Sequence, residues 1–501
     1  MTMAALEEPV PSRTWITRRL ASSPPWVRVA YAIFAVIPLY IATYSWKTPM
    51  FTLPLSYIDN ATMVGGTSLQ TGLAAGQTIG FALGKIPAAV LMSSSIFFRR
   101  RYVVMIAIMA AAALSNGLGI ALFDSISPLA QAICGAGVSA FFASSVFGGI
   151  VSWLEGRRAT ELLLATLNLA VVLAGGAGRG YGLVLLKWGV APRWMPLVAS
   201  GSGLAVCVVA LAMLAQLPAQ LPGDTEQRGK RGAMSHAQRC RFCVRFAPGI
   251  AVSLASYLVV MSLRGFRDFY ALELYTEALG GAAPSSTLLF LADAPGGVVA
   301  CVILALMSRF KRNKRALLTM VAVMIVGIAE VFVSTLLFRL HLIGGVAWLI
   351  AVGVGIYTAY LPMGSAFFDR LLAASGIGGT VMLMTFACDG VGYVGTLGLL
   401  VWKTAESRGG GGAAASRGSP SALFSTACLY ACGVLLVLLL LQALYFAWTL
   451  PRESVASTEA TAMRAEGESA DTVAVQAGTT LETPFLLDDI VAAESWEQSS
   501  S

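Results

Sequence analysis

Two apolar stretches decide the fold of this chain: RVAYAIFAVIPLYIATYSWK from Arg28 to Lys47, and RFAPGIAVSLASYLVVMSLR from Arg245 to Arg264. Each begins with an arginine, continues through apolar residues and ends on a second cation, and the two cations are 19 residues apart in both stretches. An apolar run of about 20 residues is long enough to cross the hydrocarbon core of a bilayer. The stretches therefore predict two membrane-spanning helices in equivalent places of a repeated structure.

The rest of the chain follows the same plan. Apolar runs recur from Val27 to Leu450, about a dozen of them by the length that spans a bilayer. Only 12% of the 501 residues are charged and 57% are hydrophobic, whereas about 25% of residues are charged in soluble domains. A second spacing is also repeated, because Arg158 to Tyr181 and Arg370 to Tyr393 both span 23 residues. We predict an all-α polytopic membrane protein with about 12 transmembrane helices in two pseudo-symmetric six-helix halves.

Basic residues set the expected orientation. They follow the second, fourth, sixth, eighth and tenth spans, at residues 99–101, 157–158, 228–245, 309–315 and 370. The positive-inside rule then places both termini in the cytosol, and it explains the net charge of +8 without a nucleic-acid partner. We expect neither a cleaved signal nor a transit peptide.

Five segments are expected from this topology. They are a cytosolic N-terminal segment (1–26), a six-helix half (27–215), a cytosolic central loop (216–245), a second six-helix half (246–450) and a disordered acidic cytosolic tail (451–501).

Charged residues inside the spans are the main clue to function. A Lys or Arg at the bilayer centre costs roughly 2.5 to 3.5 kcal/mol, so such residues usually face a cavity, a partner or a substrate path. Three acids oppose five cations there: Asp293, Glu330 and Asp389 against Lys47, Lys85, Arg179, Arg264 and Arg267. The excess of positive charge predicts an anionic ligand.

Lys47 and Arg264 are the leading ligand candidates, because they hold equivalent positions in the two halves. Two cations that face one cavity repel each other, and a dianion such as a phosphate ester would relieve the repulsion and accept charge-assisted hydrogen bonds. The alternative is that both side chains extend to the outer membrane interface.

The other charged residues have supporting roles in this interpretation. Lys85 faces the cavity or pairs with an acid, and Arg179 either contacts the ligand or bridges to Asp389. Asp293 and Asp389 either bind protons, because low dielectric disfavours a bare carboxylate, or stay ionised as gates. We expect packing or pairing roles for Arg267 and Asp268, near the outer end of their span, and for Glu330, with Arg267 peripheral to the ligand site.

Tyrosines and amides supply further candidates. Tyr44, Tyr360 and Tyr393 could donate hydrogen bonds to an anion, as could Gln77, Asn168 and Tyr181, although each alone more often joins helices. Cys240 and Cys243 form a CxxC with His236 nearby, but a fourth ligand is missing. We predict no metal and no cofactor.

Two short motifs lie outside the expected spans. Asn60 begins an N-glycosylation sequon in the first outer loop. In the tail, Glu482, Leu486 and Leu487 match an acidic dileucine sorting signal, which would bind an adaptor at an endosomal or vacuolar membrane; the alternatives are a plain disordered segment and a protein of the plasma membrane.

Several motifs carry a resemblance to known proteins: YSWKTPMF (residues 44–51), QTIGFALGK (77–85), LRGFRDFY (263–270) and DGVGYVGTLGLL (389–400). Over residues 30–405 the chain resembles an uncharacterised family of major-facilitator-like proteins, which implies the major facilitator fold. Through the first and third motifs it is distantly similar to organophosphate:phosphate antiporters. That resemblance implies that Lys47 and Arg264 bind phosphate and that Lys85 matches a lysine of the second span. Lys47 stands where those proteins have an arginine.

The sequence therefore predicts a monomeric secondary transporter of a small organic anion, such as a phosphorylated metabolite, that works by alternating access. Two alternatives stay open: a non-transporting receptor or assembly protein with the same fold, and a transporter of a neutral solute such as a sugar or nucleoside. An embedded enzyme is not expected, because no nucleophile and base or metal-ligand cluster of known spacing is found.

Overall fold

The computed structural model describes residues 14–54, 56–57, 68–92, 95–124, 126–154, 157, 160–218, 242–307, 310, 312–375, 382–409 and 419–450. These residues are almost entirely helical. The described residues belong to one compact unit. Several residues with predicted roles lie outside the described residues: Asn60, His236, Cys240, Glu482, Leu486 and Leu487.

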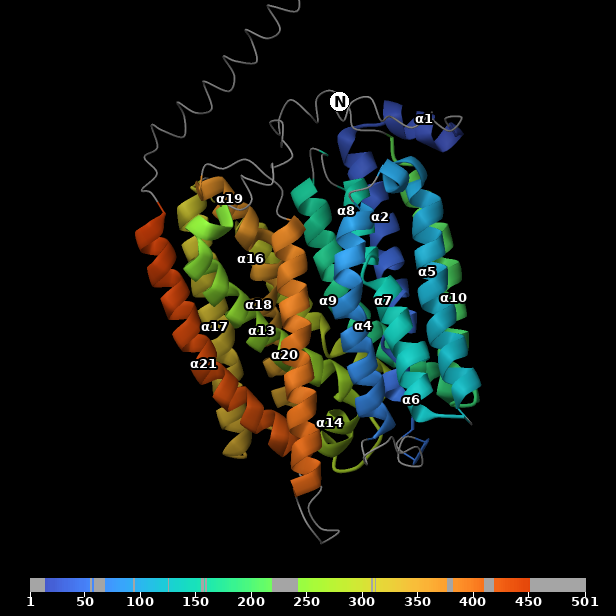
Figure 1. The fold of residues 1–501 in the computed structure, drawn as a ribbon, viewed down its shortest axis with the longest axis vertical. Helices are drawn as coiled ribbons and strands as arrows, with labels where there is room; N and C mark the ends of the chain where they lie inside the picture. Colours follow the sequence, from blue (N-terminus) through green and yellow to red (C-terminus); the bar gives the residue numbers. More distant parts are fainter. Residues whose placement is uncertain are drawn as a thin grey trace, which may run out of the picture. The chain divides into compact units, whose positions relative to one another are not determined.

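The first bundle begins with a short helix that lies across the spans at the N-terminal end (Figure 1). Its elements are α1 (Trp15–Ser22), α2 (Pro25–Ala42), η2 (Thr43–Trp46), η3 (Pro49–Thr52), α4 (Leu69–Met92), α5 (Ser95–Phe123), α6 (Pro128–Ala130), η4 (Gln131–Gly137), α7 (Val138–Ala143), α8 (Val146–Leu154), α9 (Thr160–Lys187) and α10 (Met195–Ala215).

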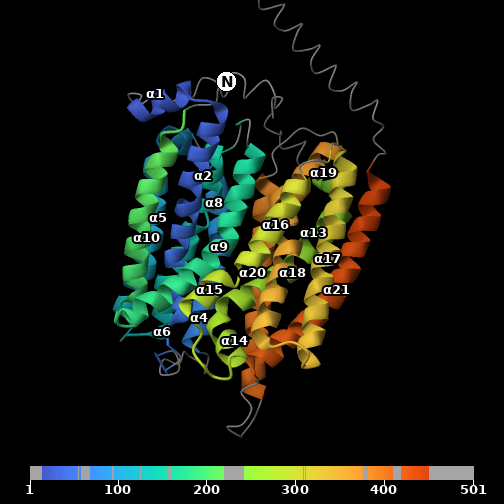
Figure 2. The same ribbon diagram turned by 180° about the vertical axis from the view of Figure 1, so that it is seen from behind.

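The second bundle lies beside the first and is coloured from yellow-green to red in Figures 1 and 2. Its elements are α13 (Ala247–Phe269), α14 (Ala271–Ala278), α15 (Ser286–Leu291), α16 (Ala294–Met307), α17 (Asn313–Arg339), α18 (Gly345–Pro362), η5 (Met363–Phe367), α19 (Phe368–Ser375), α20 (Met382–Gly409) and α21 (Pro420–Thr449).

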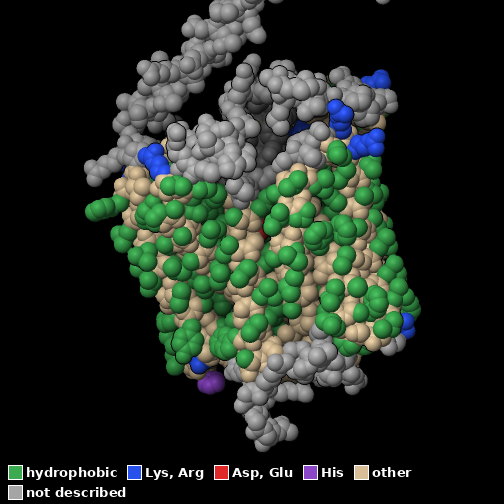
Figure 3. Space-filling view, viewed as in Figure 1, with side chains coloured by type: hydrophobic (Ala, Val, Ile, Leu, Met, Phe, Trp, Pro, Cys, Tyr) green, Lys and Arg blue, Asp and Glu red, His purple; other side chains and the backbone are tan. Residues whose placement is uncertain are grey.

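Eleven segments of the described residues are long and apolar enough to cross a membrane. Helix α20 is not among them, but its 28 residues extend about 42 Å at 1.5 Å per residue. On the face seen in Figure 3, apolar side chains cover the middle of both bundles, and Lys and Arg side chains gather mainly at the end where α1 lies. The predicted all-α, multi-pass membrane architecture is confirmed.

The two bundles meet along α4 and α9 of the first bundle. Helix α4 packs against α20, and α9 packs against α15 and α16. At the end away from the N-terminus, the Gln70 side-chain amide donates to the Phe269 carbonyl oxygen at 2.8 Å, and the Thr71 and Tyr270 hydroxyls are 2.8 Å apart. The Phe51 and Phe269 rings also meet across the bundles, with centroids 4.8 Å apart. These contacts join the bundles at this end and leave a cavity between them deeper in the molecule.

Candidate functional site

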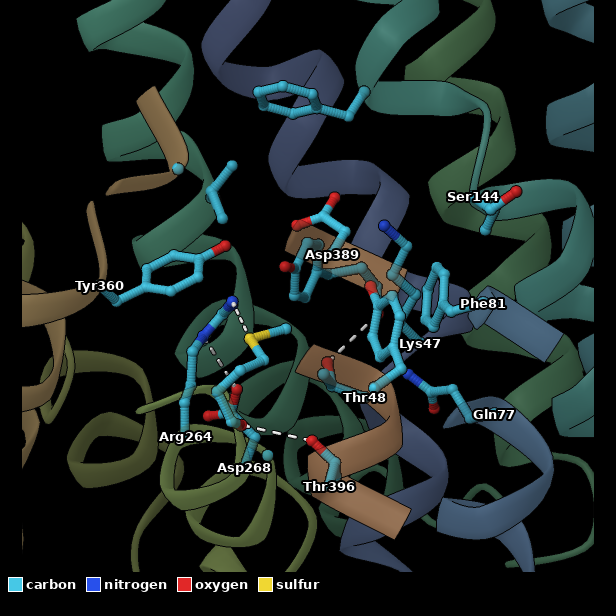
Figure 4. Close-up of a pocket in the computed structure, with 18 of the residues that line it drawn as sticks. Lys47, Thr48, Gln77, Phe81, Ser144, Arg264, Asp268, Tyr360, Asp389 and Thr396 are labelled. Atoms are coloured by element: carbon cyan, nitrogen blue, oxygen red, sulfur yellow. Dashed lines mark hydrogen bonds and ion pairs between the residues drawn. The ribbon is translucent and has the colours of Figure 1, made fainter. Parts of the chain in front are cut away.

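The cavity lies between the two bundles and takes its lining from both (Figure 4). The first bundle contributes residues of α2, α4, α9 and the turns after α2, and the second contributes residues of α13, α18 and α20. Phe51 and Phe269 line it at the closed end. Because opposite walls belong to different bundles, any movement of one bundle against the other changes its shape.

Helix α2, the first helix long enough to span a membrane, is broken where it reaches the cavity. Helix α2 ends at Ala42, η2 follows, and Lys47 stands between η2 and η3. The backbone N–H groups of Lys47 and Thr48 both donate to the Tyr44 carbonyl oxygen, at 3.0 and 3.1 Å. Pro49 then prevents a regular helix from continuing, because it has no N–H and restricts the residue before it. Broken helices at membrane depth commonly form ligand sites.

Glycines of α9 and α10 pack directly against this broken segment. A Cβ on Gly178 would stand 2.1 Å from the Thr48 hydroxyl oxygen, and one on Gly182 would stand 2.3 Å from that of Thr52. A Cβ on Gly203 would stand 1.7 Å from the Ser45 hydroxyl oxygen. The glycine-rich sequence of α9 therefore has a packing role, because it lets the backbone that carries Lys47 approach closely.

Lys47 is buried among aromatic rings. Its side chain is 7% exposed, and its Nζ lies 4.6, 5.4 and 5.5 Å from the ring centroids of Tyr44, Tyr40 and Phe81. No acid within 4.0 Å pairs with it in the part of the chain that the structure describes. Cation–π contacts stabilise an ammonium group but do not neutralise it, so its charge stays available to a ligand.

Arg264 faces the same cavity from α13, seven residues after Tyr257. Its guanidinium lies 4.6 Å from the Tyr360 ring centroid, and its Nε is 3.6 Å from a carboxylate oxygen of Asp268, one turn later in the helix. Arg264 is 8% exposed. The burial of both Lys47 and Arg264 argues against the alternative in which they extend to the membrane interface.

Lys85 and Asp389 form an ion pair across the cavity. The Lys85 Nζ lies 2.7 Å from Asp389 Oδ2, and the Tyr257 hydroxyl donates to Asp389 Oδ1 at 2.8 Å. Lys85 belongs to α4 and Asp389 to α20, so the pair joins the two bundles. The sequence left open whether Asp389 would pair with Arg179, and the structure gives it a different partner.

A second group of charged residues surrounds Asp293, the residue directly before α16. It is 1% exposed and accepts from Arg179 and Arg267, each at 2.6 Å. Arg179 also lies 3.2 Å from Asp268. Arg267 has the pairing role expected of it but does not lie at the periphery: the residue is 4% exposed, and its Nε donates to the Leu349 carbonyl oxygen at 3.3 Å. Neither Arg179 nor Asp293 lines the cavity.

The charges of this region do not balance among the described residues. All five cations are buried, and the three acids paired with them are Asp268, Asp293 and Asp389. Two positive charges are therefore left over. Lys47 has no acid, and Arg264 shares Asp268 with Arg179 at the longer of the two distances. The excess positive charge therefore falls on Lys47 and Arg264, the two residues that hold equivalent positions in the sequence repeat.

The three tyrosines proposed as ligands, Tyr44, Tyr360 and Tyr393, all line the cavity, as do Gln77 and Asn168. Tyr181 does not, and its hydroxyl lies 2.8 Å from that of Ser202. Other lining residues were missed, among them Tyr40, Phe81 and Tyr257, and Asp268, which was expected only to pack or pair, also lines the cavity. Helical spacing could have identified these residues from the sequence, because each lies four or seven positions from a charged or aromatic residue already singled out.

Comparisons with known proteins place the chain in a family. Residues 55–448 match DUF5690, a family of unknown function. The chain belongs to this family. A search of curated proteins gave no match.

Two solved structures share the fold of this DUF5690 member. One is an auto-inhibited POT family peptide transporter, with a TM-score of 0.53, 12% identity, and 85% of this chain and 97% of that one covered. The other is a bacterial homologue of the human lysosomal transporter Spinster, in an inward-facing and unoccupied conformation, with a TM-score of 0.51, 13% identity, and 85% and 98% covered. At such low identity the likeness concerns the fold alone, and the fold is of the major facilitator type.

Proposed function

We propose that this protein is a secondary transporter of a small organic anion with two negative charges, such as a phosphorylated metabolite. The anion binds between Lys47 and Arg264 in the cavity between the two bundles. The observation that carries the proposal is the excess of two buried positive charges, which falls on Lys47 and Arg264. A dianion would neutralise both and accept their hydrogen bonds.

The ion pairs between bundles support an alternating-access mechanism. Lys85 with Asp389 joins α4 to α20, and Arg179 with Asp293 joins α9 to the start of α16. Both acids are already paired with cations, which favours a gating role over proton binding. An anion in the cavity competes with Asp389 for Lys85, and this competition loosens one contact between the bundles.

The distant resemblance to organophosphate:phosphate antiporters favours the same substrate class through Lys47, Arg264 and Lys85. A lysine in place of arginine keeps the positive charge but cannot form the bidentate hydrogen bonds that a guanidinium makes with phosphate. We further propose that both termini are cytosolic, because basic side chains gather at the end where the N-terminus lies (Figure 3).

The proposal predicts that the purified full-length protein prefers dianions. Ethyl phosphate is a dianion at neutral pH, because the second pKa of a phosphate monoester is about 6, whereas propionate carries one charge on a body of similar size. We expect ethyl phosphate to raise the midpoint of thermal unfolding and propionate to raise it much less at equal concentration. Equal protection by both anions, or protection by neither, would contradict the proposed charge of the ligand.

A further inference from the structure

Helix α17 carries a glutamate close to the middle of its span. Glu330 lies four residues past Val326, the midpoint of the helix, which places it about 6 Å from that midpoint at 1.5 Å per residue. The hydrocarbon core of a bilayer is about 30 Å thick. A glutamate side chain is shorter than the lysine and arginine chains that reach the membrane interface from inside the core. The Glu330 carboxyl group therefore lies at the depth of the hydrocarbon.

Glu330 faces away from the protein. Helix α17 lies on the outside of the second bundle, beside α21 (Figure 2), and Glu330 is exposed. It forms no hydrogen bond or ion pair with any of the described residues, so this part of the chain does not supply the pairing role expected from the sequence. Acids inside spans almost always face a bundle interior or a cavity and are paired. The uncovered carboxyl group therefore indicates a partner outside these residues.

The surface around Glu330 permits close contact with another helix. Its exposed neighbours on α17 are small or β-branched and recur every three or four residues: Ala322, Val326, Ala329 and Val333. Small residues let two helices in lipid approach closely, and a polar side chain among them joins the helices by hydrogen bonds. This stripe, with Glu330 beside it, therefore has the composition of a helix–helix interface.

Charge complementarity indicates which helix binds there. In the described spans, exposed Lys and Arg side chains lie only near helix ends, as Lys187 and Arg339 do. A second copy of this chain therefore offers no exposed cation at this depth in those spans, but it offers the same carboxyl group. A protonated carboxyl group donates to a carboxylate, and such a hydrogen bond is short and strong. One proton thus leaves two Glu330 side chains with a single shared charge.

We propose that two copies of the protein associate through α17, with their Glu330 side chains hydrogen-bonded across a two-fold axis. A two-fold contact brings the same surface of each copy together, so each stripe packs on its counterpart. The dimer replaces the monomer expected from the sequence. Glu330 does not line the cavity, so the association does not rest on the proposed transport.

Energy transfer between donor- and acceptor-labelled copies in liposomes measures the association of the full-length protein over a series of protein-to-lipid ratios. Glu330→Leu is expected to weaken the association about tenfold, because it removes the hydrogen bond between the helices. Glu330→Gln should keep most of it, since two carboxamides also hydrogen-bond to each other. Ala329→Phe should weaken it by holding the helices apart. Val209→Phe is the matched control, because Val209 is an exposed residue of α10 in the other bundle, and it should have no effect.

Thermal unfolding shows whether Glu330→Leu is folded, and its midpoint should equal or exceed that of the wild type. No energy transfer by the wild type at any ratio overturns the proposal and leaves the α17 face to lipid or to another membrane protein. Association of Glu330→Leu at the wild-type level overturns it as well. A loss in Glu330→Gln as large as in Glu330→Leu also overturns it, because the charge of Glu330, rather than a hydrogen bond between identical side chains, would then hold the copies together.

Discussion

The variant Lys47→Met is expected to lose anion binding without losing stability. The affinity for ethyl phosphate should fall by a factor of about 10 to 100, because a hydrogen bond to a charged group contributes about 1.5–3 kcal/mol. Methionine keeps the apolar chain among Tyr40, Tyr44 and Phe81. Because Lys47 has no acid partner in the described part of the chain, its removal leaves no orphaned carboxylate. The midpoint of thermal unfolding without ligand should stay the same or rise, since an unpaired buried charge is costly.

Two measurements check this expectation: thermal unfolding without ligand and calorimetric titration with ethyl phosphate. Lys187→Met is the matched control, because Lys187 is an exposed lysine at the end of α9, and it should change neither. If Lys47→Met unfolds at a clearly lower temperature, Lys47 is a structural residue. If it binds ethyl phosphate as the wild type does, the anion is bound elsewhere.

The variant Asp293→Asn is expected to have the opposite effect, a large loss of stability. It leaves Arg179 and Arg267 buried and without the carboxylate that both contact at 2.6 Å. Breaking a buried ion pair by removing one partner costs about 3–5 kcal/mol. The loss should appear as a lower yield of folded protein and a lower midpoint of thermal unfolding in detergent.

A second substitution distinguishes loss of charge balance from loss of packing. In Asp293→Asn, Arg179 still contacts Asp268 at 3.2 Å, whereas Arg267 loses the carboxylate that it contacts at 2.6 Å. Adding Arg267→Gln removes that unpaired cation and should recover part of the lost stability. If the double variant is no more stable than Asp293→Asn, or if Asp293→Asn is as stable as the wild type, Asp293 does not hold the bundles together through charge.

The repeat made the helical architecture and the central residues predictable. Equal spacing from Arg28 to Lys47 and from Arg245 to Arg264 fixed two equivalent positions, and the structure brings both side chains into one cavity. Spacing along a helix also contains the information for Asp268, four residues after Arg264, and for Tyr40, four before Tyr44. These three-dimensional neighbours follow from the 3.6-residue period.

The pairing of charges between bundles was not predictable in the same way. Residue spacing alone does not determine how each helix is rotated about its axis or where the helices break. Asp293 lies in the break between α15 and α16, where it reaches Arg179 and Arg267. Arg267 turns inward beside α18, where a Cβ on Gly353 would stand only 2.6 Å from its guanidinium. The partner of Lys85 likewise depends on the packing of α4 against α20.

Counterflow across a membrane is the direct test of whether the protein transports an anion that Lys47 and Arg264 bind. Purified protein is reconstituted in liposomes loaded with ethyl phosphate or with inorganic phosphate, and uptake of the labelled anion is measured for the wild type, Lys47→Met and Arg264→Met. We expect rapid exchange by the wild type with at least one of these anions, and exchange reduced to background in both variants. Exchange by both variants at the wild-type rate, or no exchange by the wild type with either anion, would contradict the proposed function.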